Sequence, residues 1–80
     1  MTTIRMIYRY EDGGWTSESP DLAALGEGVW FSGGETFEEA RGLAEEGVPW
    51  SYERDDLVLE HFVPEAAIPQ LLAERAAAAA

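Results

Sequence analysis

Residues 34–48, GETFEEARGLAEEGV, contain the clearest helix signal in the chain and decide which fold class we expect. Thr36 stands three residues before Glu39 and directly before Phe37, which is the pattern of a capping box at a helix N-terminus. Apolar residues then recur at helical spacing among charged ones. The pattern predicts an amphipathic helix whose apolar face consists of Phe37, Ala40, Leu43, Ala44 and Val48.

This helix is predicted to end at Gly47 and Pro49, because glycine favours helix ends and proline cannot donate a backbone hydrogen bond. Gly42 lies inside the predicted helix and costs it about 1 kcal/mol relative to alanine. A close crossing of the helix over a sheet would account for this glycine. Residues 50–56 then form a polar connection or a frayed helical turn.

Strands are predicted on both sides of the helix. Ile4, Met6, Tyr8 and Tyr10 alternate with other residues, which indicates a half-buried strand over 2–10. Residues 11–14, EDGG, have the composition of a hairpin turn. Further strands are expected over 15–19, 28–32 and 57–63, with a loop over 20–25 whose leucines lie beneath the sheet.

The expected fold is therefore α+β, a small antiparallel-rich sheet in the order β-β-β-α-β with one main helix packed on one face. Residues 1–63 form this domain, and residues 64–80 form a short helical tail that begins near Pro69 and ends in frayed alanines. One helix cannot cover both faces of such a sheet. The second face, which carries Arg5, Ile7 and Arg9, is either solvated or covered by another chain.

Composition restricts the possible partners. The 80 residues include 16 acidic and 5 basic side chains, a net charge of -11, and no cysteine. So short a chain has a thin core, and we expect a homodimer or a larger oligomer. Nucleic acids and anionic membranes require a basic surface, so direct DNA binding and membrane binding are not expected, whereas a basic protein partner is. No spanning segment or signal peptide is recognisable, and the composition fits the cytoplasm.

No residue pattern points to catalysis, a cofactor or a metal. His61 is the single histidine and lies in the predicted fourth strand without a recognisable partner, so a structural or surface role is the simpler interpretation. The acidic pairs are neighbours in turns or on the helix surface, where they do not converge on one ion. We therefore do not expect an enzyme, a bound metal or a cofactor.

Candidate interface residues come from the tryptophans and the acids. Trp15 and Trp30 could anchor a partner, although both could equally be core residues. If Phe31 packs beneath the helix, Trp30 points to the second face of the sheet. Trp50, in the connection after the helix, is a weaker candidate.

Asp21 follows Pro20 and either shapes its loop through the local backbone or contacts a partner. The acidic candidates for steering a basic partner are Glu35, Glu38 and Glu45.

The stretch from Tyr8 to Val48 resembles the N-terminal domain of HicB-like antitoxins. The resemblance rests on Pro20-Asp21-Leu22 after a strand hairpin, the Gly34-Glu35-Thr36 turn, the Glu39-Ala40 pair that opens the helix, and Ala44 one turn on. The chain departs from the family at residues 23–25, AAL, where a Pro-Gly-Cys type of sequence is usual. The segment after Val63 also has no room for the family's DNA-binding module.

This resemblance implies a degraded RNase H-like sheet without nuclease activity. It further implies an antitoxin function, in which the chain binds and masks a small basic RNA-cleaving toxin of the HicA-like kind, with acids for steering and aromatics for anchoring. Operator binding is not implied. The alternative is a stand-alone structural or regulatory module that only self-associates.

Overall fold

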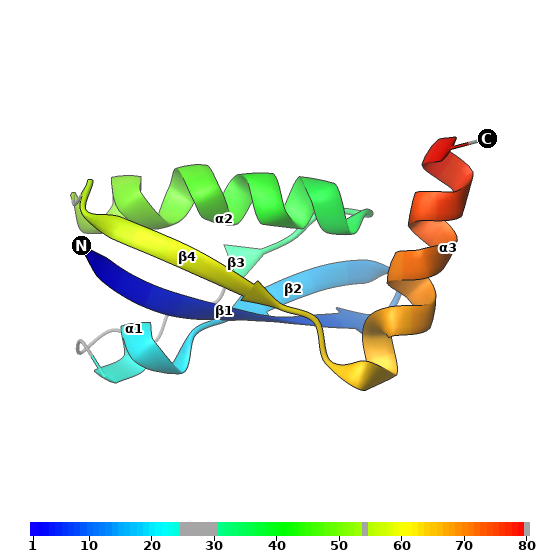
Figure 1. Cartoon of the computed structure of the whole chain (residues 1–80), viewed down its shortest axis with the longest axis horizontal. Coiled ribbons are helices and arrows are strands. Elements are labelled where there is room, and N and C mark those ends of the chain that lie inside the picture. The colour runs from blue at the N-terminus through cyan, green and yellow to red at the C-terminus, as the bar shows by residue number, and fades with distance from the viewer. Residues whose placement is uncertain (25–30, 54, 80) are drawn as a thin grey trace.

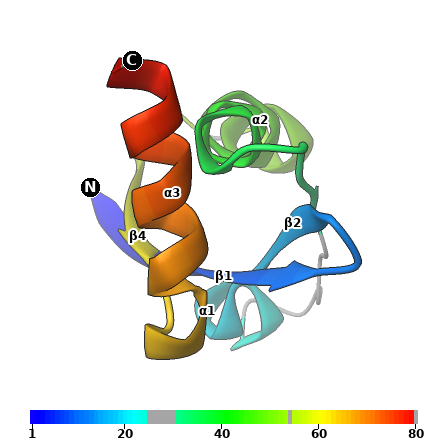
Figure 2. The ribbon, with the colours of Figure 1, turned by 90° about the vertical axis from the view of Figure 1, so that its right-hand side faces the viewer.

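The computed structural model describes residues 1–24, 31–53 and 55–79 of the chain. Their strands form one four-stranded sheet in the order β3-β2-β1-β4. Helix α2 lies along one face of this sheet, whereas α1 lies on the other side of β1 (Figures 1 and 2). The elements are β1 (Thr2–Glu11), β2 (Gly14–Glu18), α1 (Pro20–Ala24), β3 (Phe31–Ser32), α2 (Phe37–Tyr52), β4 (Leu57–Phe62), the 3-10 turn η1 (Glu65–Ala67) and α3 (Ile68–Ala79).

The sheet confirms the predicted fold class and element order. β2 pairs antiparallel with both β1 and β3, and β4 pairs parallel with β1. The first hairpin closes through Asp12 and Gly13, whose φ angles of 52° and 78° are those of a type I′ turn. Of the predicted third strand, residues 31–32 form β3, and residues 28–30 lie outside the described part.

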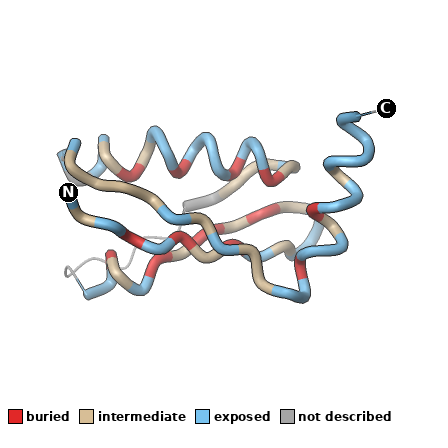
Figure 3. Tube along the Cα trace, viewed as in Figure 1, coloured by how far each residue is buried: buried red, intermediate tan, exposed pale blue. Residues whose placement is uncertain are grey.

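The core lies between the sheet and α2, as Figure 3 shows by the buried positions along both. Ile4, Met6 and Tyr8 of β1 are fully buried, while Arg5 and Arg9, each next to a buried residue, are exposed, so the predicted alternation is confirmed. The other buried apolar residues are Trp15, Leu22, Phe37, Ala40, Ala44, Val48, Ala67 and Leu71.

The predicted start of α2 is confirmed by its cap. The Thr36 hydroxyl accepts a hydrogen bond from the Glu39 N–H at 3.2 Å. The Glu39 carboxylate reaches back to the N–H of Glu35, also at 3.2 Å, which is one residue earlier than in a standard capping box. Of the predicted apolar face, only Leu43 is misplaced, since it is 49% exposed.

The predicted end of α2 is wrong. The helix continues through Pro49 to Tyr52 and is capped by Glu53, which has a left-handed φ of 51° and donates its N–H to the carbonyls of Pro49 and Trp50. A proline inside a helix loses its own backbone hydrogen bond and crowds the preceding turn, but its φ is helical, so it need not end the helix at once. As a consequence, Trp50 belongs to the helix surface and not to a connection.

Two glycines illustrate different local requirements. Gly42 is exposed and a Cβ there would meet nothing, so the expected close crossing over the sheet is wrong. Gly33, by contrast, allows the chain to pass close to β2 and α2, because a Cβ there would collide with the Trp15 carbonyl and with the Cβ of Ala40.

Helical structure is more extensive than predicted at two places. Residues 20–24 form α1 and not a loop, although Leu22 is buried as expected. The C-terminal helix is preceded by η1 and continues to Ala79, so the alanines that were expected to fray are helical. Alanine has the highest intrinsic helix propensity, which accounts for this extension.

Candidate protein-interaction surface

The most exposed aromatic residue in the described part lies on α2. Trp50 is 82% exposed, and Leu43, seven residues before it, shares the same side of the helix. Together with Glu46 and Gly47 they line a shallow groove of about 310 Å³. Because Gly47 has no side chain, the space between Leu43 and Trp50 is left open. We call these four residues the α2 groove.

Acidic residues flank the α2 groove. Glu39 and Glu46 are seven residues apart and therefore lie on one side of α2, and Glu53 follows at the C-cap. Arg41 is the single basic residue of α2, and its ion pair with Glu38 is long, at 3.7 Å. The surface thus combines an exposed aromatic anchor with negative charge, which suits a basic protein.

The structure buries Trp15, so its predicted role as a surface anchor is wrong. Trp15 is 1% exposed, and its ring packs edge-on against Tyr10 and Phe37. Its indole N–H donates to the Glu74 carboxylate at 2.7 Å. Trp30 lies outside the described residues.

Asp21 is held by Arg5 and not by its own loop. Its Oδ2 accepts the Arg5 backbone N–H at 2.8 Å, and its two carboxylate oxygens accept the guanidinium at 3.0 and 3.1 Å. The guanidinium hydrogen bonds, followed by the backbone one, lower the pKa of Asp21 below its ordinary value. Asp21 therefore continues the hydrogen bonding of β1 beyond the last residue of β2.

The three predicted acidic residues are not gathered around the α2 groove. Glu35 is exposed before the helix, and Glu38, with its side chain 71% exposed, lies in its first turn. Glu45 is seven residues after Glu38, and it accepts a hydrogen bond from His61 of β4. Glu38 and Glu45 therefore lie on the side of α2 that faces β4, whereas Glu39 and Glu46 lie beside the groove.

His61 has two partners that the sequence did not reveal. The Tyr8 hydroxyl lies 2.7 Å from Nδ1, and the Glu45 carboxylate lies 2.6 Å from Nε2. Both hydrogen bonds form with a neutral imidazole: the Tyr8 hydroxyl donates to Nδ1, and Nε2–H donates to Glu45. Burial, and then the charge of Glu45, raise the pKa of Tyr8 well above its ordinary value. Tyr8 is thus a buried phenol, and the trio fastens α2 to β1 and β4.

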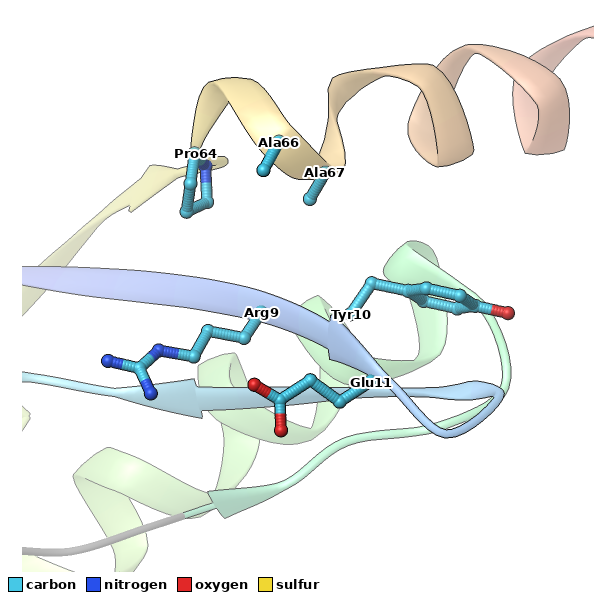
Figure 4. Close-up of a pocket in the computed structure, with 6 residues that line it drawn as sticks. All are labelled: Arg9, Tyr10, Glu11, Pro64, Ala66 and Ala67. Carbon is cyan, nitrogen blue, oxygen red and sulfur yellow. The ribbon is translucent and has the colours of Figure 1, made fainter.

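Two further hollows occur in the described part. A polar one of about 320 Å³ lies between α2, β4 and α3, and Arg41, His61 and Arg75 are among its lining residues. A second, of about 280 Å³, lies between the end of β1 and the η1 turn. Figure 4 shows Arg9, Tyr10 and Glu11 on one side of it, and Pro64, Ala66 and Ala67 on the other.

Among residues 1–24, 31–53 and 55–79, no cluster of His, Cys, Asp and Glu side chains is arranged to hold a metal ion. None of the helices described is long and apolar enough to cross a membrane. Comparison with protein-family models, with curated proteins and with solved structures finds no match.

The α2 groove was missed because of one local interpretation. If the helix ends at Pro49, the sequence does not say on which side of the helix Trp50 lies, and its position relative to Leu43 is unknown. The heptad spacing of Leu43 and Trp50, and of Glu39 and Glu46, was nevertheless present in the sequence. Continuing the helix by one turn would have placed Trp50 on the same side as Leu43, but only the structure shows that this side is exposed.

Proposed function

We propose that this chain is a protein-binding module that masks a small basic RNA-cleaving protein, as HicB-like antitoxins do, in the cytoplasm. The observation that carries the proposal is the exposure of Trp50 beside Leu43 on an acidic helix. Tryptophan in a partly formed hollow is a typical energetic centre of a protein interface. The net charge of -11 favours a partner of opposite charge.

In the proposed binding mode, the acidic residues and the apolar residues have separate roles. Glu39, Glu46 and Glu53 attract the basic partner and orient it along α2. Trp50 and Leu43 then supply the apolar contact, and a side chain of the partner occupies the space above Gly47. Masking follows if the basic surface that contacts α2 is the one with which the partner binds RNA.

The test begins with the small basic protein that copurifies in equal amount with the tagged chain from its own host. That protein is identified by mass, produced separately, and assayed for RNA cleavage with and without the chain. Inhibition at one-to-one stoichiometry is expected. Trp50→Ala is expected to weaken binding by about 30-fold or more, since the loss of a central aromatic residue costs at least about 2 kcal/mol.

Leu72→Ala is the matched control, because Leu72 is a similarly exposed apolar residue on α3, at 57%. It should bind and inhibit as the wild type does. Equal binding by both variants would contradict the role of the α2 groove. Recovery of no basic protein from cells that express the neighbouring genes would contradict the masking function.

A further inference from the structure

The face of the sheet opposite α2 has an apolar centre. In the register of β1 and β4, Ile7 lies beside Phe62, and Thr3 lies beside Val58. These residues alternate with the buried ones, so they point away from α2. Phe62 is 45% exposed, while Ile7 and Val58 are half-buried. We call this surface, together with the charged residues around it, the outer face.

The two arginines of the outer face are both paired with carboxylates, so its charges are less one-sided than those on α2. Arg5 is paired with Asp21 at 3.0 Å, and Arg9 is paired with Glu18 at 3.1 Å. Glu60 lies beside Arg5 in the strand register. Hydrogen bonding to Asp21 and the charge of Asp21, and to a smaller extent the charge of Glu60, raise the pKa of Arg5. Two of the five arginines of this acidic chain are therefore on the outer face.

The outer face continues into the hollow beside η1. Arg9 and Glu11 line that hollow and belong to the same side of β1 as Ile7 (Figure 4). The parallel pairing of β1 with β4 ends at Ile7 and Phe62, so the last residues of β1 have β2 as their described neighbour strand. The apolar centre is thus bordered by a concave region, lined partly by Pro64 and Ala66.

We infer that the outer face is the surface through which two copies of this chain form a dimer. A basic partner is drawn to the acidic side of α2, whereas a second copy, with its own charge of -11, is repelled there. Two copies repel each other less across the outer face, because Arg5 and Arg9 offset part of its acidic charge. The apolar centre, Ile7, Val58 and Phe62, then becomes buried between two sheets.

A two-fold axis makes this face complementary to itself. Arg5 of one copy lies opposite Glu60 of the other, and the Phe62 rings pack at the centre, beside α1 of each copy. Dimerisation adds buried apolar area to a domain that is too small for a large core. This inference does not depend on the masking function, since the α2 groove lies on the other side of the sheet.

Sedimentation equilibrium of the purified 80-residue chain tests the inference. The wild type is expected to dimerise, and Phe62→Asp is expected to raise the dimer dissociation constant by about tenfold or more. Leu72→Asp is the matched control, because it places the same charge on an exposed apolar position of α3. Trp50→Ala should also remain dimeric, which separates this surface from the one proposed to bind the basic protein.

Glu60→Arg gives a second readout that does not disturb the apolar centre. The substitution makes the chain less acidic, so non-specific association would increase. If Arg5 faces Glu60 across the two-fold axis, the dimer instead weakens. A wild type that is monomeric at millimolar concentration would overturn the inference. So would a dimer that Leu72→Asp dissociates and Phe62→Asp does not.

Discussion

Glu74 connects the C-terminal helix to two other parts of the molecule through one carboxylate. It accepts hydrogen bonds from the Trp15 indole N–H at 2.7 Å, from the Phe37 backbone N–H at 2.7 Å, and from Gln70 at 2.9 Å. Phe37 is the first residue of α2, so the carboxylate also lies at the positive end of a helix dipole. A single side chain thereby orders β2, α2 and α3 relative to one another.

Glu74→Gln is expected to reduce the free energy of unfolding by about 1–2 kcal/mol, because a neutral amide replaces a charged acceptor of several hydrogen bonds. Urea denaturation followed by circular dichroism measures the loss. Glu46→Gln, on the exposed side of α2, is the control and should change stability by less than about 0.5 kcal/mol. Equal effects of the two substitutions would contradict the special role of Glu74.

The same residue predicts a pH dependence. Burial raises the pKa of Glu74, but its three hydrogen bonds outweigh burial and leave the pKa below the ordinary value of 4.5. A carboxylate with a lowered folded pKa stabilises the fold above 4.5, and this contribution is lost as the pH falls through the lowered pKa. The difference in stability between wild type and Glu74→Gln should therefore shrink on acidification. A difference that stays constant down to about pH 3 would disprove the carboxylate's role.

Gly33 and Gly42 allow a matched pair of substitutions by alanine. Gly42→Ala is expected to stabilise the chain by about 1 kcal/mol, because the position is helical, exposed and open to a Cβ. Gly33→Ala is expected to destabilise it by about 1–3 kcal/mol, because the Cβ collides with the Trp15 carbonyl. Thermal unfolding of both variants checks the opposite signs, and a shift in the same direction would contradict the local packing described here.

At the scale of elements, the sequence was informative wherever structure depends on neighbours in the chain. The alternation of Ile4, Met6 and Tyr8 and the capping residue Thr36 are local signals, and they predicted β1 and the start of α2 correctly. Pro49 is also a local signal, but a proline is compatible both with the end of a helix and with its continuation. Packing decides between the two. The five-residue helix α1 is too short to leave a periodic pattern.

Contacts between distant elements could not be predicted in this way. Glu74 is 59 residues from Trp15 and 37 from Phe37, and nothing in its own neighbourhood indicates either partner. His61 is similarly 53 residues from Tyr8. The burial of Trp15 follows from such contacts, which is why the sequence left Trp15 open between a surface anchor and a core residue.

The helix α3 provides a test at this scale, because its two halves differ in burial. Leu71 is buried and Glu74 bonds to Trp15 and Phe37, whereas Ala76 to Ala79 are exposed. Removal of residues 76–80 should cost less than about 0.5 kcal/mol. Removal of residues 68–80 should cost about 3 kcal/mol or more, since a buried leucine and the Glu74 hydrogen bonds are lost together.

Urea denaturation of the two truncated chains measures these costs, with the full chain as the reference. Comparable stability of the full chain and the chain ending before Ile68 would mean that α3 is independent of the core. A large loss on removing only the alanines would mean that the end of α3 makes contacts essential for folding.

At the scale of the whole molecule, charge is distributed so that two surfaces on opposite sides of the sheet suit different partners. The side of α2 with Glu39 and Glu46 is acidic, whereas the outer face also carries two arginines, in its Arg5–Asp21 and Arg9–Glu18 pairs. If the first binds a basic protein and the second a copy of the chain, both can be occupied at once. The two associations should then respond to salt in opposite directions.

Screening explains the expected signs. Charges interact over a Debye length of about 30 Å at 0.01 M salt and about 8 Å at 0.15 M. Attraction between the acidic chain and a basic partner therefore declines with salt, and the association rate should fall over this range. Salt also weakens the repulsion between two copies of charge -11, so the dimer should become tighter. Salt screens the attraction between Arg5 and Glu60 as well, but these contacts are short and their loss is the smaller effect.

Stopped-flow association with the basic partner and sedimentation equilibrium of the chain alone measure the two responses. Glu39→Gln combined with Glu46→Gln should slow association and reduce its salt dependence, while the dimer is unaffected. An association rate that does not change with salt would remove the proposed steering role of these acids. A dimer that weakens with salt would mean that attraction between charges, and not apolar contact at Ile7 and Phe62, mainly stabilises the interface.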